Sequence, residues 1–378
     1  NEIIIRIGAH PGVIPYWFYS GRDSDKKYWT PGIWDDVSII SCDNPYIESI
    51  QVAPDINNSA ITIQVKINNF SGDENFSLNY TIREWKSGNE VASLNMRILS
   101  SGENYNVITE KIDIPDAHLW SPDNPFLYVV QIKTPGDNAE VRFGLRELRF
   151  ETKTRKAYLN NKIFYMRGSN IALHRFFDDS LCRKQPWDRK WVKRLLVDIP
   201  KEFNWNTFRT HVGFVPDFWL DIADEYGILI QYEMQNWRTQ PFWNLNTFQK
   251  VVEDWMRDSW NHPSVVIWDI CNEYRGSETG EIIKAVRHLD LSNRPWDNGY
   301  NLPLDENDPI EDHHYLKFFT KRGEIARWEM DFYEQTVAPN GTRNVPFPSN
   351  HATILNEYGW FFNRRDGSVG SAAIEQMK

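Results

Sequence analysis

Cysteine is scarce in this sequence: the 378 residues contain three, Cys42, Cys182 and Cys271, and these are far apart. An odd number at these spacings argues against a disulfide framework and against a cysteine metal site. Long apolar runs are also missing, since no stretch approaches the roughly 20 residues that a membrane-spanning helix needs. There is no stripe of basic residues, and the net charge of −10 argues against nucleic acid as a partner.

Aromatic residues, by contrast, are abundant, with 17 Trp, 16 Tyr and 21 Phe. Many will lie in the core, but sugar-binding clefts also use aromatic faces, because the apolar face of a pyranose stacks on a ring. Hydrophobic residues make up 41% of the chain and charged residues 25%, which is ordinary for a globular protein. A chain of this length can form two or three domains with a large core.

The first 150 residues are typical of β-structure. Apolar and polar residues alternate in ITIQVKINNF, FSLNYTIREW, YNVITEKIDI and LYVVQIKT. Their spacing and length predict a β-sandwich of roughly 100 residues. Residues 1–46 contain strand-like segments such as GIWDDVSII but are too short for a core of their own, so we interpret them as the end of a preceding β-domain.

Strands and helices alternate after residue 153. Seven strands are expected, starting near residues 163, 206, 228, 264, 294, 309 and 352, with helices over 191–203, 216–227, 248–261, 280–290 and 324–335. Pro200 should end or kink the first of these helices. Such βα units predict a parallel sheet with right-handed crossovers, and eight of them close a barrel. We therefore expect a barrel without its eighth strand, in a piece of a longer protein.

Two apolar strand-like segments each end in Asn-Glu: SVVIWDICNE at 264–273 and ATILNE at 352–357. In a barrel of parallel strands, side chains at the C-terminal strand ends point into one shared pocket. One carboxyl group that donates a proton and one that acts as nucleophile are what retaining hydrolysis of a glycosidic bond requires. We predict Glu273 as the acid/base and Glu357 as the nucleophile, with carboxyl groups about 5–5.5 Å apart. A single Asn-Glu would favour a solvated or ion-paired glutamate, but two at strand ends argue against it.

Further polar side chains fall near the same strand ends. Asn272 can bond the sugar hydroxyl next to the anomeric carbon, and Arg209 can orient the nucleophile and keep it ionised. A structural ion pair beneath the site is an equal alternative for Arg209. His174 could meet a sugar hydroxyl or be a satisfied loop histidine. The adjacent His313 and His314 have no second ligand pair at metal spacing, so no metal is predicted.

Several aromatic residues suit either the pocket or the core. Tyr315 can donate a hydrogen bond to the nucleophile, with aromatic packing as the alternative. Trp360, three residues after Glu357, suits the wall of a sugar pocket. Trp237 and Trp243 suit it too, and generic packing is an equal alternative for both.

Together these motifs resemble glycoside hydrolase family 2, over nearly the whole chain. VVIWDICNE is similar to the acid/base segment of that family, ILNEYGW to its nucleophile segment, MRGSNIALHR to its first barrel strand, and NTFRTHVGFVPDFWLDIADEYGI to its arginine strand and following helix. GIWDDVSI resembles the closing strand of its jelly-roll domain. The resemblance implies jelly-roll strands in 1–46, an immunoglobulin-like sandwich in 47–152 and a catalytic (β/α)8 TIM barrel in 153–378.

By this resemblance the catalytic pair is Glu273 and Glu357, and no cofactor is implied. The implied substrate-binding residues are Asn272, Arg209, His174, Tyr315 and Trp360. Three departures stand out. THVGFVP follows the arginine in place of Ser-His-Tyr-Pro, which leaves the role of His211 open, and QYEMQNW lacks the Glu-x-His metal motif of large β-galactosidases. Trp360 stands where some β-galactosidases carry a histidine.

The resemblance implies a retaining exo-β-glycosidase acting on a carbohydrate. Galactose is the first expectation for the terminal sugar, with glucuronic acid and mannose as alternatives. A non-catalytic carbohydrate-binding relative is a second hypothesis, disfavoured by the two intact glutamates, and a barrel hydrolase of another clan is a third, disfavoured by the sandwich. Family habit favours the periplasm or secretion over the cytoplasm, without a nucleic-acid or membrane partner. The oligomeric state is left open, with a homo-oligomer among the options.

Overall fold

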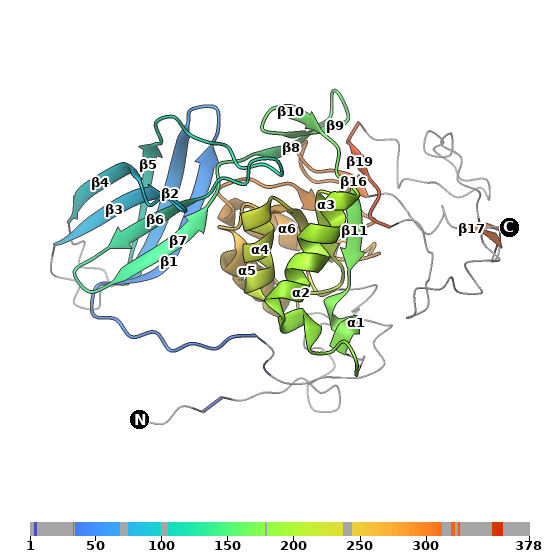
Figure 1. The fold of residues 1–378 in the computed structure, drawn as a ribbon, viewed down its shortest axis with the longest axis horizontal. Coiled ribbons are helices and arrows are strands. Elements are labelled where there is room, and N and C mark those ends of the chain that lie inside the picture. The colour runs from blue at the N-terminus through green and yellow to red at the C-terminus, as the bar shows by residue number, and fades with distance from the viewer. Residues whose placement is uncertain are drawn as a thin grey trace.

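The computed structural model describes residues 4–5, 33, 35–68, 75–99, 105–177, 180–236, 244–311, 319–321, 324–325 and 350–357. A β-sandwich packs beside a unit of parallel strands and helices (Figure 1). Within the described ranges, no helix combines the length and the apolar character needed to cross a lipid bilayer.

Residues 46–143 form the sandwich, from two antiparallel sheets. One sheet has the order β1-β2-β5, with bounds Tyr46–Asp55, Ala60–Asn68 and Tyr105–Asp113. The other has the order β4-β3-β6-β7, with bounds Glu90–Ile98, Phe76–Glu84, Tyr128–Lys133 and Asn138–Phe143. Alternate residues point into the core, as in β2, where Ile61, Ile63 and Val65 are fully buried. A β-sandwich therefore precedes the barrel, as the alternation predicted.

The strand expected within residues 32–40 is not found, because residues 35–45 contain no strand. Val37, Ile39 and Ile40 are 63%, 80% and 83% exposed. No strand of the described residues pairs with this segment. A strand needs a neighbour for its backbone N–H and C=O groups, so β-favouring residues alone do not produce one.

In the part of the chain that the structure describes, seven strands after the sandwich pair in parallel. Five form one sheet in the order β11-β12-β13-β14-β15, with bounds Gly168–Ile171, Thr207–Thr210, Leu229–Glu233, Val265–Asp269 and Trp296–Asp297. Two more pair as β16-β19, with bounds Ile310–Glu311 and Thr353–Ile354. In the five-stranded sheet, neighbours in space follow each other in the chain and are parallel, which is the arrangement of a barrel built from βα units.

The first barrel strand is shorter than predicted. Of the segment expected from residue 163, Lys162–Phe164 is β10 and belongs to an antiparallel sheet of order β10-β9-β8, with β9 at Lys156–Leu159 and β8 at Leu148–Glu151. Only β11 joins the parallel sheet. The tight turn between β9 and β10 pairs these two strands locally, so the chain reaches the barrel a few residues later than the apolar pattern suggests.

Helices follow the first four barrel strands, β11 to β14. The segment before β12 runs through α2 (Arg189–Lys193), the π-helical turn η2 (Arg194–Asp198) and α3 (Ile199–Glu202). Pro200 does not end it, because Pro200 falls in the first turn of α3, where a missing N–H is tolerated. The other helices of the described residues are α1 (Leu173–Phe177), η1 (Gln185–Trp187), α4 (Asp217–Tyr226), α5 (Leu245–Ser259), α6 (Glu278–Val286) and η3 (Arg287–Leu289).

The helix expected over 324–335 is wrong at its start. Glu324–Ile325 is the short strand β18, paired with β17 at Phe319–Lys321. The rest of that expected helix lies outside the described residues.

The sandwich is fixed to the barrel largely through backbone groups. Arg146, in the joining segment, donates from Nε to Pro263 O at 2.9 Å and from Nη2 to Val265 O at 2.6 Å. Val265 is the first residue of β14. At the end of α4, Gly227 has a φ of +74°, and a Cβ there would lie 2.7 Å from the Cα of Pro122. Only glycine combines that backbone conformation with so close an approach.

Candidate active site

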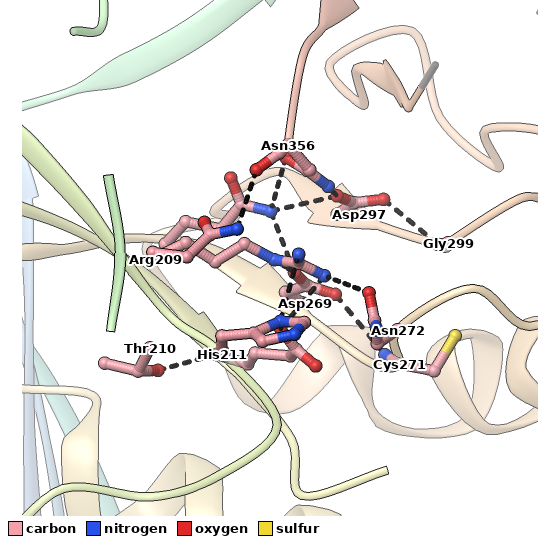
Figure 2. Close-up of polar contacts among 12 residues, drawn as sticks. Arg209, Thr210, His211, Asp269, Cys271, Asn272, Asp297, Gly299 and Asn356 are labelled. Carbon is pink, nitrogen blue, oxygen red and sulfur yellow. Dashed lines mark hydrogen bonds and ion pairs between the residues drawn. The ribbon is translucent and has the colours of Figure 1, made fainter. Parts of the chain in front are cut away.

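Arg209 on β12 lies at the centre of a polar cluster at the C-terminal ends of the strands (Figure 2). Its Nε donates to Asp269 Oδ2 at 2.8 Å and its Nη2 to Asn272 Oδ1 at 3.1 Å. Nη2 also lies 2.9 Å from Glu233 Oε2, and Nη1 lies 3.5 Å from Glu357 Oε1. One guanidinium therefore joins side chains from β13, from β14 and its following loop, and from the segment after β19.

The charged groups in this cluster shift one another's pKa values. Burial disfavours the guanidinium charge, but the carboxylates of Glu233 and Asp269 outweigh it and hold the pKa of Arg209 well above its usual value. Burial in turn raises the pKa of Glu233 well above its usual value and raises the pKa of Asp269, although Arg209 opposes both effects. Arg209 thus stays charged at any working pH and keeps a fixed positive charge beside Glu357.

A second set of hydrogen bonds holds Asn356, the residue directly before Glu357 (Figure 2). Asn356 Nδ2 donates to Asp297 Oδ2 at 2.7 Å, and Asn356 Oδ1 accepts from Gln231 Nε2 at 3.2 Å. Its backbone carbonyl accepts from Asn170 Nδ2 at 3.0 Å. Side chains of β11, β13 and β15 therefore fix the backbone from which Glu357 projects.

Asp297 is placed as an acceptor. Besides Asn356 it accepts from Gln231 Nε2 at 2.9 Å on the same Oδ2, and its Oδ1 accepts from the Gly299 N–H at 3.0 Å. Burial, then the nearby Asp269 and Glu311, raise the pKa of Asp297 well above its usual value. The three N–H donors act in the opposite direction, because each stabilises the anion.

Glu273 lies where the chain turns away from β14. Its φ of 51° is in the left-handed region, which residues other than glycine rarely adopt and which is common at functional sites. Glu273 is half-buried, whereas the neighbouring Asn272 is buried. The Oε1 of Glu273 accepts a hydrogen bond from Tyr300 Oη at 3.4 Å. The turn therefore points Glu273 out of the strand while Asn272 stays in the Arg209 cluster.

His211 lies against the candidate nucleophile. Its Nε2 is 3.7 Å from Glu357 Oε1, and its Nδ1 is 3.3 Å from Glu233 Oε2. The Nη1 of Arg209 is 3.3 Å from the same Nδ1. The sequence left the role of His211 open, and the structure gives it a contact with two carboxylates at the cluster.

The predicted site residues fall into two groups. Arg209 contacts both Asn272 and Glu357 directly, and Glu273 adjoins Asn272 in the chain. His174 is buried on α1, where a methyl group on Gly213 would lie 4.0 Å from its Nδ1. Tyr315 and Trp360, like Trp237 and Trp243, lie outside the described residues. The roles assigned to all of them stay predictions.

Sequence reasoning missed the buried acids and amides that complete the cluster. They occupy the ends of apolar strands and are Gln231, Glu233, Asp269, Asp297, Glu311 and Asn356, each no more than 8% exposed. The signal was present in QYEM, IWDI and PWDN, because a charged or amide side chain inside a buried strand is tolerated only with partners.

One group of side chains in the described residues has the spacing of a metal site: Asp221, Asp224 and His262. Arg142 of the sandwich already supplies positive charge there, because its Nη2 bonds Asp221 and lies 3.7 Å from Asp224 Oδ2. Burial disfavours the His262 charge, but Asp224 and Asp217 outweigh it and raise the pKa of His262 to about 10. The group is an ion-pair network between the sandwich and α4, and we assign no metal to it.

Comparison with known proteins finds the same family in the sandwich and in the barrel. Residues 45–146 match the family described as Glycosyl hydrolases family 2, and residues 150–360 match the TIM barrel domain of the same family. A β-galactosidase of Clostridium acetobutylicum is 28% identical over 302 residues, which are 71% of this chain and 31% of the relative. A β-glucuronidase of Streptococcus agalactiae is 25% identical over 214 residues, 49% of this chain and 34% of the relative.

This chain therefore spans about a third of the length of these two relatives. Among solved structures, the β-glucuronidase of Ruminococcus gnavus in complex with D-glucaro 1,5-lactone is similar with a TM-score of 0.53 and 22% identity, over 68% of this chain and 42% of that one. At this identity the likeness shows the fold. The barrel match alone covers more than half of the residues, and it agrees with the strand order described above: this chain belongs to glycosyl hydrolase family 2.

Proposed function

We propose that this chain carries the active site of a retaining exo-β-glycosidase, with Glu273 as general acid/base and Glu357 as nucleophile. The observation that carries the proposal is the double contact of Arg209. Its guanidinium bonds the side chain of Asn272, the neighbour of Glu273, and forms an ion pair with Glu357. Two Asn-Glu segments far apart in the sequence thus meet at one side chain.

The contacts of the two glutamates support opposite roles. Glu357 lies 3.5 Å from the Arg209 guanidinium, which can orient its carboxylate for attack. Glu273 accepts a hydrogen bond from the neutral hydroxyl of Tyr300, which does not require Glu273 to be ionised. In the proposed mechanism Glu357 attacks the anomeric carbon while Glu273 protonates the leaving oxygen. Glu273 then takes a proton from the water that hydrolyses the glycosyl-enzyme.

The side-chain NH2 group of Asn272 is the part of this residue that we expect to bind substrate. Its Oδ1 already accepts from Arg209, so its Nδ2 is the group that remains to donate. A donor at this point suits the sugar oxygen next to the anomeric carbon, whose hydrogen bond strengthens in the transition state.

For the terminal sugar we propose galactose first and glucuronic acid second. The Clostridium relative is a β-galactosidase and is similar over 71% of this chain, and the Streptococcus relative is a β-glucuronidase and is similar over 49%. Mannose is the third option from the sequence.

Residues 1–46 are proposed to belong to a jelly-roll domain, and the sandwich is proposed to be immunoglobulin-like. The exposure of Val37, Ile39 and Ile40 supports the first assignment, because further strands of such a domain would cover them.

A panel of para-nitrophenyl β-glycosides tests the function, with galactoside, glucuronide and mannoside as the central members. Hydrolysis of one glycoside is expected, with retention of anomeric configuration by NMR. Glu357→Gln should lower kcat by about 10³-fold or more, because the amide is not a nucleophile. Glu202→Gln, the same change at an exposed position on α3, is the matched control. Activity of folded Glu357→Gln close to wild type would overturn the assignment.

A further inference from the structure

A separate hollow lies beside Glu273 at the same end of the barrel. Residues after β14 and on α6 form one wall, and residues after β15 form the other. The cavity has a volume of about 580 Å³, and the residues that matter here are Arg275, Gly280, Glu281, Lys284, Tyr300 and Leu304. This volume is within the range of small-molecule sites, about 300–1,000 Å³.

Tyr300 connects the cavity to the proposed acid. It lines the cavity, and its hydroxyl donates to Glu273 Oε1 at 3.4 Å. A general acid protonates the glycosidic oxygen from the leaving-group side of the bond. A ligand in this cavity is therefore next to the acid and on the side of the departing group.

The charged side chains of the lining are mainly positive. Arg275 lies over the Tyr300 ring, with its guanidinium carbon 5.4 Å from the ring centre. Lys284 is exposed on α6 and has no ion-pair or hydrogen-bond partner among the described residues. Glu281 is the acidic member of the lining. Glu278 on the same helix is not part of the lining and accepts a hydrogen bond from Tyr274 Oη at 2.8 Å.

We propose that this cavity binds the leaving-group part of the substrate and selects a saccharide that carries a carboxylate or sulfate. The inference rests on the proposed function, because it takes Glu273 as the acid. An anionic group in the cavity faces Arg275 and Lys284, with opposition from Glu281 alone among the charged residues of the lining. The barrel would then select on both sides of the scissile bond.

Two fluorogenic substrates with the same sugar isolate the effect: a 4-methylumbelliferyl and a 3-carboxyumbelliferyl β-glycoside. The second carries a carboxylate on the leaving group. Lys284→Gln and Arg275→Gln should each lower the kcat/KM ratio of carboxylated to methylated substrate by about two- to fivefold, the effect of one exposed charge. Glu281→Gln should raise this ratio. Lys250→Gln, an exposed lysine on α5, is the matched control and should leave it unchanged.

Binding without turnover is measured by calorimetric titration of the full chain with D-glucuronic acid, glucose 6-sulfate and D-glucose. The anionic sugars should bind more tightly than glucose, and Lys284→Gln and Arg275→Gln should reduce that difference. A preference for the carboxylate or for the sulfate identifies the favoured anion, and either supports the proposal. The proposal would be overturned if neither Lys284→Gln nor Arg275→Gln changed the kcat/KM ratio of the two substrates or the affinity difference between anionic sugars and glucose. Failure of the proposed function is distinct, because wild-type protein would then hydrolyse neither substrate while the calorimetric difference persists.

Discussion

Replacing Asp297 by asparagine should weaken both the fold and the placement of Glu357. Asp297 accepts from Asn356 and Gln231 on Oδ2 and from Gly299 on Oδ1. An amide has one acceptor oxygen, so it can accept either from Gly299 or from Asn356 and Gln231. Its NH2 group then faces the remaining donor or donors. Loss of one or two hydrogen bonds to a buried anion corresponds to about 2–5 kcal/mol in the free energy of unfolding.

The same pair of residues offers a rescue. In the double variant Asp297→Asn/Asn356→Asp, the amide at position 297 donates to a carboxylate at position 356, and its oxygen still accepts from Gly299. Gln231 still donates to position 356. We expect a coupling free energy of about 1–3 kcal/mol in the double-mutant cycle. The kcat/KM for an aryl glycoside, about 10²-fold lower in Asp297→Asn because the nucleophile is displaced, should recover by about tenfold.

The double variant also has a functional signature that stability alone does not produce. It moves a negative charge onto the residue next to Glu357, so the acidic limb of the kcat/KM profile should shift to higher pH. The four proteins of the cycle are compared by urea unfolding and by pH profiles, with Asp254→Asn, an exposed change on α5, as control. If Asp297→Asn unfolds and turns over like wild type, the carboxyl is already protonated or does not hold Asn356, and the reasoning is refuted.

Three further changes test other contacts. Arg209→Lys keeps the charge but cannot reach the same set of partners, so kcat for an aryl glycoside should fall by about 10²-fold with a smaller change in KM; a wild-type rate would contradict the role of the guanidinium. Gly227→Ala should lower the free energy of unfolding, measured in urea, by about 1–3 kcal/mol, and by more than Gly88→Ala, which shares its φ of +74° but has no atom within 4 Å of the added Cβ. The pKa of His262 is raised from 6.5 to about 10, so its contribution to stability is complete below pH 6.5 and is lost as the pH rises to 10. His262→Gln should therefore reduce the fall in urea midpoint between pH 7 and pH 10, and parallel pH curves would contradict this.

The sequence was informative where the physical cause is local. Alternation with a period of two identified the sandwich strands, and apolar runs separated by helical segments identified seven barrel strands. Glu273 and Glu357 could be singled out because each follows an asparagine at the end of an apolar strand-like segment. These features depend on neighbouring residues in the chain.

The sequence was less informative where distant partners decide the outcome. Lys162–Phe164 and Gly168–Ile171 are both strands, and only the tertiary arrangement assigns the first to an antiparallel sheet and the second to the barrel. Asp297 and Gln231 gain their role from Asn356, which lies far along the chain. Residues 37–40 have the composition of a strand but pair with no strand among the described residues.

The hydrogen bond from Arg146, in the segment that joins sandwich and barrel, to β14 determines whether the barrel can be separated from the sandwich. The carbonyl of Val265, which opens β14, accepts from Arg146 Nη2 at 2.6 Å and from Arg294 Nε at 2.8 Å. The other end of that strand leads to Glu273, so Arg146, which lies outside the barrel, helps to fix the position of the proposed acid along the barrel axis. A barrel separated from Arg146 would lose a buried donor to two backbone carbonyls. The unit that evolution or a protein engineer can transplant is therefore the barrel together with its linker and sandwich.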